Sequence, residues 1–499
     1  MGVADANAFN PAQAISFLQS NIWHGRIFDG TWAEPPNGII DIIEPATGDV
    51  LGQAGLAGAK AVEDAAGAAA VAQAEWVSMP PRDRAEIFRK AAKVFEDNFD
   101  EFALWIARET GAILPKGQHE VREAITILHL AAGQVLQPQG TLLPSTPGRL
   151  SYARRVPHGV VGVISPFNFP LVLSIRNVAP ALAMGNAVIV KPDPRTPVTG
   201  GFLIARAFEE AGLPHSLLHI LPGGADVGEA ICIDPRISVV CFTGSEAVGR
   251  RIGELAGKSL KKVSLELGGK NVLIVLDDAD LDRAASNAAW GAYLHQGQIC
   301  MAAGRILVHE SIAADLTARL VEKAKHLPVG NPATGQVALG PIINANQVER
   351  IKTILNDTIA QGAVLEAGGT HEGLFFKPTV LSNVRPGMRA FDEEVFGPVA
   401  SIVTFKSDEE AVAMTNSTDG RLAVGIISKS VGRANAIGER VKAGMVHVND
   451  QTVNDECVNP FGGYGTGSNG SSVGGPADID LYTDWQWVTV KDTPPMFTF

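Results

Sequence analysis

The chain has 499 residues, of which 46% are hydrophobic and 19% charged, and its formal net charge at pH 7 is −12. This length exceeds what one hydrophobic core organises, so we expect two or three domains in a globular protein, not a disordered or fibrous one. The acidic excess argues against duplex nucleic acid or an anionic membrane as the main partner, because both repel a negatively charged protein.

The sequence contains no clear signal for secretion, for a membrane span or for disulfide bonds. The stretch Met1–Ser20 lacks the basic segment and continuous apolar core of a signal peptide. The uncharged stretch from Val156 to Ile175 is interrupted by Pro166 and Pro170, which favours a buried strand and a loop over a membrane span. The four cysteines form no CxxC pair and no metal-finger spacing, which predicts reduced thiols, a cytoplasmic protein and no bound metal.

The first helices are predicted from apolar side chains that repeat at helical spacing. Residues 82–108 predict one long helix, and a second helix is predicted over 119–136, after the breaks at Gly111 and Pro115.

From residue 158 onward, short β-branched runs alternate with helical stretches, which predicts βαβ units and a parallel sheet. The predicted strands are Gly159–Ile164, Ala187–Val190, Leu217–Leu221, Ile237–Phe242, Lys262–Leu265 and Val272–Leu276. Because such sheets bind ligands at the carboxyl ends of their strands, we expect chemistry just after each run.

Beyond residue 280 the alternation of helix and strand begins again, which predicts a second α/β domain. Its first elements are a helix over 280–294, a loop with Cys300, a strand over Arg305–His309 and a helix over 311–326. The segments 139–156 and 477–499 look like exposed strands that need a partner. They predict an oligomerisation arm; the alternative is a strand folded back on the chain's own core.

Polar side chains follow three of the predicted strands. Asn168, between aromatic residues and prolines, is suited to hold an amide rigidly toward a developing oxyanion; the alternative is that it caps its own turn. Lys191 is placed to meet a ribose or a phosphate, or else is a solvated charge at the sheet edge. The turn Thr243-Gly244-Ser245 before a helix predicts a phosphate cradle, although it is not a GxGxxG motif.

Two further segments carry reactive groups. A free cysteine is usually a small buried apolar side chain. Cys300, however, follows a polar, glycine-bearing loop, and Glu266 lies upstream in a glycine-rich turn, a pairing that favours a nucleophile and a base. Farther along, Glu394 and Phe396 place a carboxylate and an aromatic ring beside a turn.

Together these segments resemble the aldehyde dehydrogenase superfamily, in the family's order and over nearly the whole chain. The matching segments are Pro166–Pro170, Lys191-Pro192, Phe242–Ser245, Glu266–Lys270, Gly297–Cys300, Glu394–Pro398 and Pro460–Gly463. The resemblance implies an α/β fold with a Rossmann-type parallel-sheet cofactor domain, a second α/β catalytic domain and a small β arm. The implied limits are 1–138 and 157–267 for the dinucleotide-binding domain, 268–476 for the catalytic domain, and 139–156 with 477–499 for the oligomerisation arm.

The resemblance also implies catalytic roles. Cys300 would attack the aldehyde carbon, and Asn168 with the Cys300 backbone N–H would hold the oxyanion. Glu266 would activate the water that cleaves the resulting thioester, working best with a pKa raised by partial burial. A matching glutamate implies hydrolysis to a carboxylic acid, not transfer to coenzyme A.

The implied cofactor is NAD. The residues expected around it are Ile164, Ser165, Pro166, Phe167, Lys191, Pro194, Arg195, Gly224, Phe242, Gly244, Ser245, Leu267, Gly268, Glu394 and Phe396. Many NAD-using relatives carry a ribose-binding glutamate where this chain has Pro194. Its loss removes repulsion against a 2′-phosphate, and Arg195 either attracts that phosphate or faces solvent. We therefore predict NAD with some tolerance for NADP.

The substrate is expected to be a small aldehyde bound by a mostly apolar pocket, suited to a ring or a medium aliphatic chain. The pocket residues implied by their places beside the motifs are Phe169, Val172, Leu173, Arg176, Ile299, Met301 and Phe461. Arg176 either meets a polar ring substituent or pairs with an acidic neighbour. The runs Leu173–Arg176, Lys191–Arg195 and His295–Met301 resemble the benzaldehyde and vanillin dehydrogenase branch, so an aromatic aldehyde is the leading expectation.

Three alternatives differ from this interpretation. One keeps the enzyme class with an aliphatic aldehyde or semialdehyde as substrate. Another is an esterase or thioesterase that uses Cys300 and Glu266 without redox chemistry. The last is a binding or structural protein that has lost activity, against which intact Asn168, Glu266 and Cys300 argue. The expected assembly is a homodimer or homotetramer.

Overall fold

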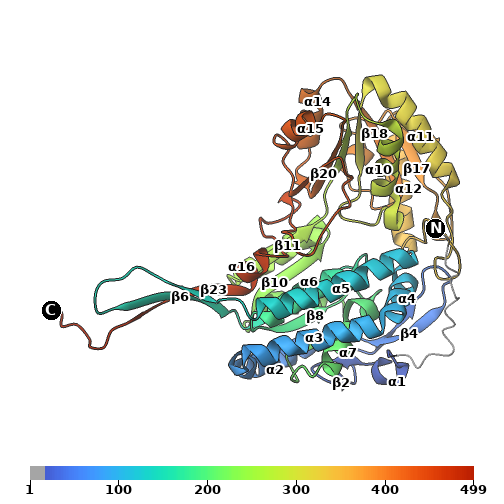
Figure 1. The fold of residues 1–499 in the computed structure, drawn as a ribbon. Coiled ribbons are helices and arrows are strands. Elements are labelled where there is room, and N and C mark those ends of the chain that lie inside the picture. The colour runs from blue at the N-terminus through green and yellow to red at the C-terminus, as the bar shows by residue number, and fades with distance from the viewer. Residues whose placement is uncertain (1–16) are drawn as a thin grey trace, which may run out of the picture.

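The computed structural model describes residues 17–499 and contains two seven-stranded sheets with helices around them, and a three-stranded sheet that projects from one side (Figure 1). The first sheet has the order β11-β10-β7-β8-β9-β1-β2. Its strands are β11 (Lys262–Leu267), β10 (Ile237–Gly244), β7 (Val160–Ile164), β8 (Ala187–Lys191), β9 (Leu218–Ile220), β1 (Ile27–Phe28) and β2 (Trp32–Ala33). The strands from β11 to β9 are parallel, and β1 and β2 continue the sheet in antiparallel pairing.

The strands of this sheet form where the sequence predicts them. Every residue of β7 is buried, and so are the first four of β8. Such continuous valine and isoleucine runs suit a parallel sheet, because helices cover both of its faces. The predicted parallel sheet is confirmed, with strand ends displaced by one or two residues.

The helical region before the sheet differs from its prediction. Residues 82–108 do not form one helix: α3 (Pro81–Asp97) and α4 (Phe99–Thr110) are separated at Asn98. Asn98 has non-helical backbone angles, and its side-chain amide donates to the Val94 carbonyl at 2.8 Å, competing with the continuing helix.

The next helix begins earlier than predicted. It is α5 (Leu114–Gln134), where a start at residue 119 was expected. Pro115 lies in its first turn, where the missing N–H of proline costs no helical hydrogen bond.

The second sheet has the order β14-β17-β18-β13-β12-β20-β21. Its strands are β14 (Val364–Ala367), β17 (Thr379–Ser382), β18 (Val399–Phe405), β13 (Arg305–His309), β12 (Val272–Val275), β20 (Ala423–Ile427) and β21 (Met445–Val448). Around it lie helices that include α10 (Leu281–Tyr293), α11 (Ala313–His326) and α12 (Ala345–Ala360) (Figure 1). The predicted second α/β unit is confirmed; the predicted domain limits remain a prediction.

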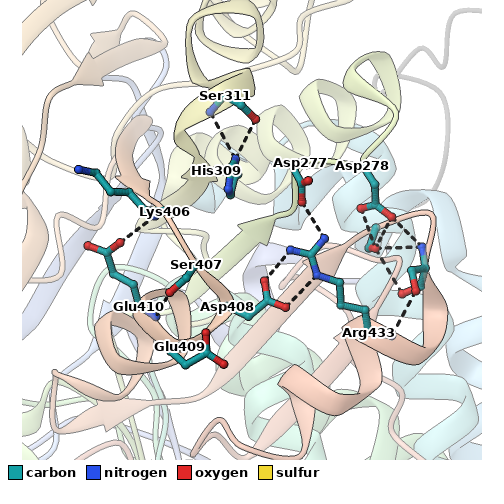
Figure 2. A network of polar contacts seen from close by, with 12 residues as sticks. Asp277, Asp278, His309, Ser311, Lys406, Ser407, Asp408, Glu409, Glu410 and Arg433 are labelled. Atoms are coloured by element: carbon teal, nitrogen blue, oxygen red, sulfur yellow. Dashed lines mark hydrogen bonds and ion pairs between the residues drawn. The ribbon is translucent and has the colours of Figure 1, made fainter.

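The carboxyl edge of this second sheet is filled by ion pairs (Figure 2). Arg433 donates to both carboxylate oxygens of Asp408, at 2.8 and 2.6 Å, and to Asp277, just after β12, at 2.7 Å. Asp278 accepts from the Ser428 hydroxyl, which follows β20, at 2.8 Å. The charges of Arg433, Asp408 and Asp277 are thus paired with one another, and Asp278 is held by hydroxyl and backbone N–H groups.

The projecting sheet is antiparallel, in the order β23-β6-β5. It joins β5 (Gly140–Leu142), β6 (Leu150–Pro157) and β23 (Thr483–Val490), and the carboxyl terminus lies at its far end (Figure 1). The tail is not extended throughout, since α16 (Ala477–Tyr482) precedes β23.

None of the helices within residues 17–499 is long and apolar enough to cross a membrane. The predicted absence of a signal peptide concerns a segment that is mostly outside the described residues, as does the first part of the predicted cofactor domain.

Candidate active site

A cleft of about 1370 Å³ lies at the carboxyl ends of the first sheet's central strands and reaches the loop that carries Cys300. Asn168, Glu266 and Cys300 all line it. Asn168 follows β7, Glu266 is near the end of β11, and Cys300 precedes β13 of the second sheet. The site therefore lies between the carboxyl edge of one parallel sheet and the amino edge of the other.

The chain turns sharply before Cys300. His295, Gln296 and Gly297 all have left-handed backbone angles, with φ of 48°, 57° and 68°. A Cβ atom at Gly297 would lie 2.1 Å from the Gly397 carbonyl oxygen, so only glycine fits there. Two successive non-glycine residues in this region are strained, and such strain persists only where the surroundings enforce it.

Hydrogen bonds hold this turn from both sides. The Gln296 amide donates to the carbonyls of Gly111 and Pro341 at 2.9 and 2.8 Å. On the other side, the Asn271 amide donates to the Cys300 carbonyl at 2.6 Å. The position of the thiol is thus fixed by side chains on separate segments.

The Asn168 amide points at the same loop. The side-chain Nδ2 of Asn168 donates to the Gln298 backbone carbonyl at 2.9 Å. The backbone carbonyl of Asn168 accepts from Lys116 Nζ at 2.6 Å. Lys116 pairs with Glu120 one turn along α5, and both side chains are almost completely buried. Sequence reasoning missed this pair, because nothing in the local pattern of α5 indicates that it reaches the Asn168 turn.

Glu120 also fixes the helix that follows Asn168. Its Oε2 accepts from the backbone N–H groups of Leu171 and Val172, each at 3.1 Å, in the first turn of α6 (Pro170–Ala183). A carboxylate at a helix amino terminus is stabilised by these N–H groups and by the helix dipole. One buried ion pair therefore holds both the Asn168 carbonyl and the start of α6.

Burial acts on the protonation of the two candidate reactive groups. It raises the pKa of the Cys300 thiol to about 12, with further contributions from Glu394, Asp455 and Glu266. Burial likewise holds the pKa of Glu266 well above its usual range, and neither of its carboxylate oxygens has a hydrogen-bond partner among residues 17–499. A carboxylate with a raised pKa is the stronger base once it is ionised.

All but one of the residues expected around the cofactor line the cleft. The exception, within the described residues, is Pro194; its neighbour Asp193 lines the cleft instead. Arg195 is partly exposed and its charge is paired: its Nε and Nη2 donate to Asp193 at 2.8 and 2.6 Å, and its guanidinium lies 4.2 Å from the Phe167 ring centroid. Sequence reasoning missed Asp193, because a single acidic residue between two prolines carries no local sign of what it faces.

The cleft fits a dinucleotide. Helix α9 (Glu246–Lys258) begins at its wall, and its N-cap, Ser245, makes no side-chain capping bond, which leaves the first-turn N–H groups facing an anion site. A Cβ atom at Gly268 would lie 2.4 Å from Glu394 Oε2, so glycine keeps this wall open. Burial raises the pKa of Glu394 to about 7.

Lys270, which sequence reasoning did not place in the site, also lines the cleft. It is 4% exposed, burial lowers its pKa to about 7, and its Nζ has no hydrogen-bond partner among residues 17–499. Within the same range no group of three or more His, Cys, Asp or Glu side chains is arranged to hold a metal.

The residues expected to bind the substrate lie beside this cleft. Of that set, within residues 17–499, Phe461 alone lines it. The others are buried or half-buried next to it: Phe169, Val172, Leu173, Arg176, Ile299 and Met301. Arg176 Nη2 pairs with Asp455 at 2.5 Å, and its guanidinium lies 4.9 Å from the Phe461 ring centroid. The pocket assignment stays a prediction.

Comparison with known proteins identifies one family. The sequence model of the aldehyde dehydrogenase family matches residues 32–488. A vanillin dehydrogenase from Amycolatopsis sp. (strain ATCC 39116 / 75iv2) is 49% identical over 478 residues, covering 96% of this chain and 98% of the relative. An NAD(+) benzaldehyde dehydrogenase from Pseudomonas putida is 49% identical over 479 residues, with the same coverage of 96% and 98%.

Among solved structures, the betaine aldehyde dehydrogenase of Staphylococcus aureus in complex with NAD+ has a TM-score of 0.92 at 29% identity, covering 96% of this chain and 97% of that one. The family resemblance and the α/β architecture predicted from the motifs are confirmed. The family match over most of the length, and relatives at this identity and coverage, show that the chain belongs to the aldehyde dehydrogenase family.

Proposed function

We propose that this enzyme oxidises an aromatic aldehyde to the carboxylic acid with NAD as cofactor. The observation that carries the proposal is the meeting of Cys300, Glu266 and Asn168 on one cleft that also fits a dinucleotide. The vanillin and benzaldehyde dehydrogenases that match nearly the whole chain support an aromatic substrate, and the name of the second one supports NAD. Aliphatic aldehydes and semialdehydes are the alternative substrates.

In this proposal Cys300 Sγ, after losing its proton to water, adds to the aldehyde carbon and forms a tetrahedral adduct. The Asn168 amide and the Cys300 backbone N–H stabilise the oxyanion of that adduct. NAD held in the cleft would supply the hydride acceptor for the oxidation, and the oxidised acyl group would remain on Cys300 Sγ as a thioester.

Glu266 then takes a proton from water, which attacks the thioester and releases the acid. Burial favours this role, because its carboxylate has no competing hydrogen bond among residues 17–499 and a pKa well above the usual range. Lys191 and Glu394 would hold the ribose hydroxyls of the cofactor, and the start of α9 at Ser245 its pyrophosphate.

The test is the formation of NADH on addition of benzaldehyde, followed by its absorbance. Cys300→Ala should abolish it, whereas Cys241→Ala, a buried cysteine of β10, serves as the matched control and should retain it. Appreciable NADH from Cys300→Ala would contradict the nucleophile assignment. Ester hydrolysis without any NADH would instead favour a hydrolase.

We further infer that the enzyme assembles into a homodimer or homotetramer through the projecting sheet, and that it works in the cytoplasm. The exposed apolar side chains of that sheet support assembly. The net charge of −12 and the four unpaired cysteines support a cytoplasmic enzyme whose partner is a small molecule, not nucleic acid or a membrane.

A further inference from the structure

Arg176 is a buried cation with unused hydrogen-bond donors. Its side chain is 3% exposed, and Nη2 pairs with Asp455 Oδ2 at 2.5 Å. Its Nε and Nη1 have no acceptor among residues 17–499. A guanidinium carries five N–H donors, and burying charged donors without partners costs free energy. The arrangement is therefore suited to an acceptor that the chain itself does not supply.

The position of Arg176 relates these donors to the reaction centre. Val172, Leu173 and Arg176 lie on one face of α6, at i, i+1 and i+4 spacing, and α6 starts directly after Asn168 and Phe169. An aldehyde held at the Asn168 end with its ring along this face would point toward Arg176.

Two other observations agree with an aldehyde ring that points toward Arg176. The guanidinium lies 4.9 Å from the ring centroid of Phe461, which lines the cleft together with Cys300. Its positive charge also partly opposes the rise that burial causes in the pKa of both Glu266 and Cys300. Arg176 is thus close enough to the reacting groups for its field to act on them.

The arginine at the cofactor end of the cleft provides a contrast. Arg195 has Nε and Nη2 both satisfied by Asp193, and its side chain is 38% exposed, so water reaches the rest. Nε and Nη1 of Arg176 have no acceptor among residues 17–499, and its side chain is only 3% exposed. N–H donors without an acceptor do not by themselves indicate a ligand site. They do so here because they belong to a buried cation whose charge acts on the Cys300 thiol.

We propose that Arg176 binds an oxygen substituent on the ring of the aromatic substrate and so selects hydroxylated or methoxylated benzaldehydes over benzaldehyde. This inference rests on the proposed function. The apolar face of Val172, Leu173 and Phe461 suits the ring, and the free N–H groups suit a phenolic or ether oxygen at its far side. A phenolate is the strongest acceptor, because both partners of the hydrogen bond are then charged.

The first test compares kcat/KM for 4-hydroxybenzaldehyde, vanillin and benzaldehyde. Arg176→Met should lower the ratio of kcat/KM for 4-hydroxybenzaldehyde to that for benzaldehyde by about 10- to 100-fold, the value of a hydrogen bond to a charged group. Because that variant leaves the Asp455 carboxylate without its partner, the double variant Arg176→Met/Asp455→Asn provides the same comparison with both charges removed.

Two matched variants separate binding from structure. Asp455→Asn keeps the guanidinium, and Arg195→Met removes the other arginine of the cleft; each should preserve the wild-type ratio between the two aldehydes. An equal loss of kcat/KM for benzaldehyde and 4-hydroxybenzaldehyde in the Arg176 variants would overturn the proposal and leave Arg176 as a structural partner of Asp455.

The second test is spectroscopic and needs no turnover. With Cys300→Ala enzyme, bound 4-hydroxybenzaldehyde should show more of the phenolate absorbance than the free aldehyde at the same pH, and adding Arg176→Met should remove that increase. Unchanged phenolate absorbance on binding contradicts the proposal. If the wild-type enzyme prefers hexanal to every benzaldehyde, the proposed aromatic function fails; if it oxidises benzaldehyde well but ignores ring oxygens, this inference alone fails.

Discussion

At the scale of single residues, the site places its reactive groups where burial opposes their charged forms. Burial raises the pKa of Cys300 to about 12 and holds the pKa of Glu266 well above the usual range. Burial therefore disfavours the thiolate form of Cys300 and the ionised form of the Glu266 carboxyl group. The reaction depends on the fraction of Glu266 that is ionised, and this fraction is lost as the pH falls through its raised pKa.

Glu266→Gln should let the first turnover proceed and slow the steps that follow. We expect a burst of NADH of about one equivalent per site and a steady rate lowered by about 10²- to 10⁴-fold, the usual contribution of a general base. Stopped-flow absorbance measures both phases. The acid limb of the pH profile for the steady rate should also disappear, and a steady rate close to that of the wild type would require another base.

Asp193 is the residue expected to decide between the two nicotinamide cofactors. Its carboxylate lines the cleft close to Lys191 and is neutralised by Arg195. Asp193→Ser should raise the ratio of kcat/KM with NADP to that with NAD by about 10- to 100-fold, because it removes a negative charge near the 2′-phosphate and frees Arg195. Arg195→Met is the matched control and should move the ratio the other way; a fall with Asp193→Ser would exclude this role.

At the scale of helices and strands, α5 supports the turn that carries Asn168, the proposed oxyanion donor. Lys116 and Glu120 connect it to the Asn168 carbonyl and to the start of α6. Lys116 Nζ also lies 4.1 Å from the centroid of the Phe169 ring, so the pair is covered by an aromatic side chain. A displacement of this helix would move the Asn168 amide relative to Cys300.

The double variant Lys116→Met/Glu120→Gln should lower kcat for aldehyde oxidation by about 10- to 100-fold, since small misplacements of a catalytic group have effects of this size. KM for NAD should change much less, because the pair touches the Asn168 turn and not the cofactor end of the cleft. The matched control is Lys93→Met/Asp97→Asn, an exposed pair at the same i,i+4 spacing on α3, which should leave kcat unaltered.

The single variant Lys116→Met should lower the free energy of unfolding by about 3–5 kcal/mol relative to wild type, because it leaves the buried Glu120 carboxylate without its cation. The double variant should lose less stability than this single variant. Chemical denaturation measures this difference. A double variant with wild-type kcat and normal folding would show that Asn168 does not depend on α5.

Elements were predictable where the cause is local. The runs Val160–Ile164 and Ala187–Val190 contain no polar side chain and formed strands as expected. The break at Asn98 was missed because the apolar period continues across it, while a side-chain hydrogen bond to Val94 ends the helix. No spacing in the sequence indicates that Lys116 reaches the carbonyl of Asn168, a contact 52 residues apart in the chain.

The candidate site divides in the same way. The cofactor end of the cleft was predictable from motifs, since strand ends, glycine turns and a helix start follow one another in a fixed order. Asn168, Glu266 and Cys300 also line one cleft, as predicted. The substrate end depends on side chains that meet across α6 and the loop around Asp455. Long-range packing determines those contacts, so the sequence alone left open whether Arg176 pairs with an acidic neighbour.

At the scale of the whole molecule, the carboxyl edges of the two large sheets differ: one borders the cleft and the other carries a network of ion pairs. The first sheet ends in the cleft, whereas the second ends in the ion pairs around Arg433 (Figure 2). The projecting sheet, β23-β6-β5, lies at neither of these two edges. It extends from the body as an arm (Figure 1). Exposed apolar side chains on this arm include Leu142, Leu150, Trp485 and Trp487.

The arm is expected to be the main subunit interface, because Trp485 and Trp487 are 55% and 65% exposed on neighbouring same-face positions of β23. Trp485→Glu/Trp487→Glu should reduce the native mass found by size-exclusion chromatography with light scattering to that of a single chain. Trp290→Glu, which changes a tryptophan 54% exposed on α10, is the control and should keep the wild-type mass. A monomeric wild-type protein, or equal dissociation of the control, would show that the arm does not hold the subunits together.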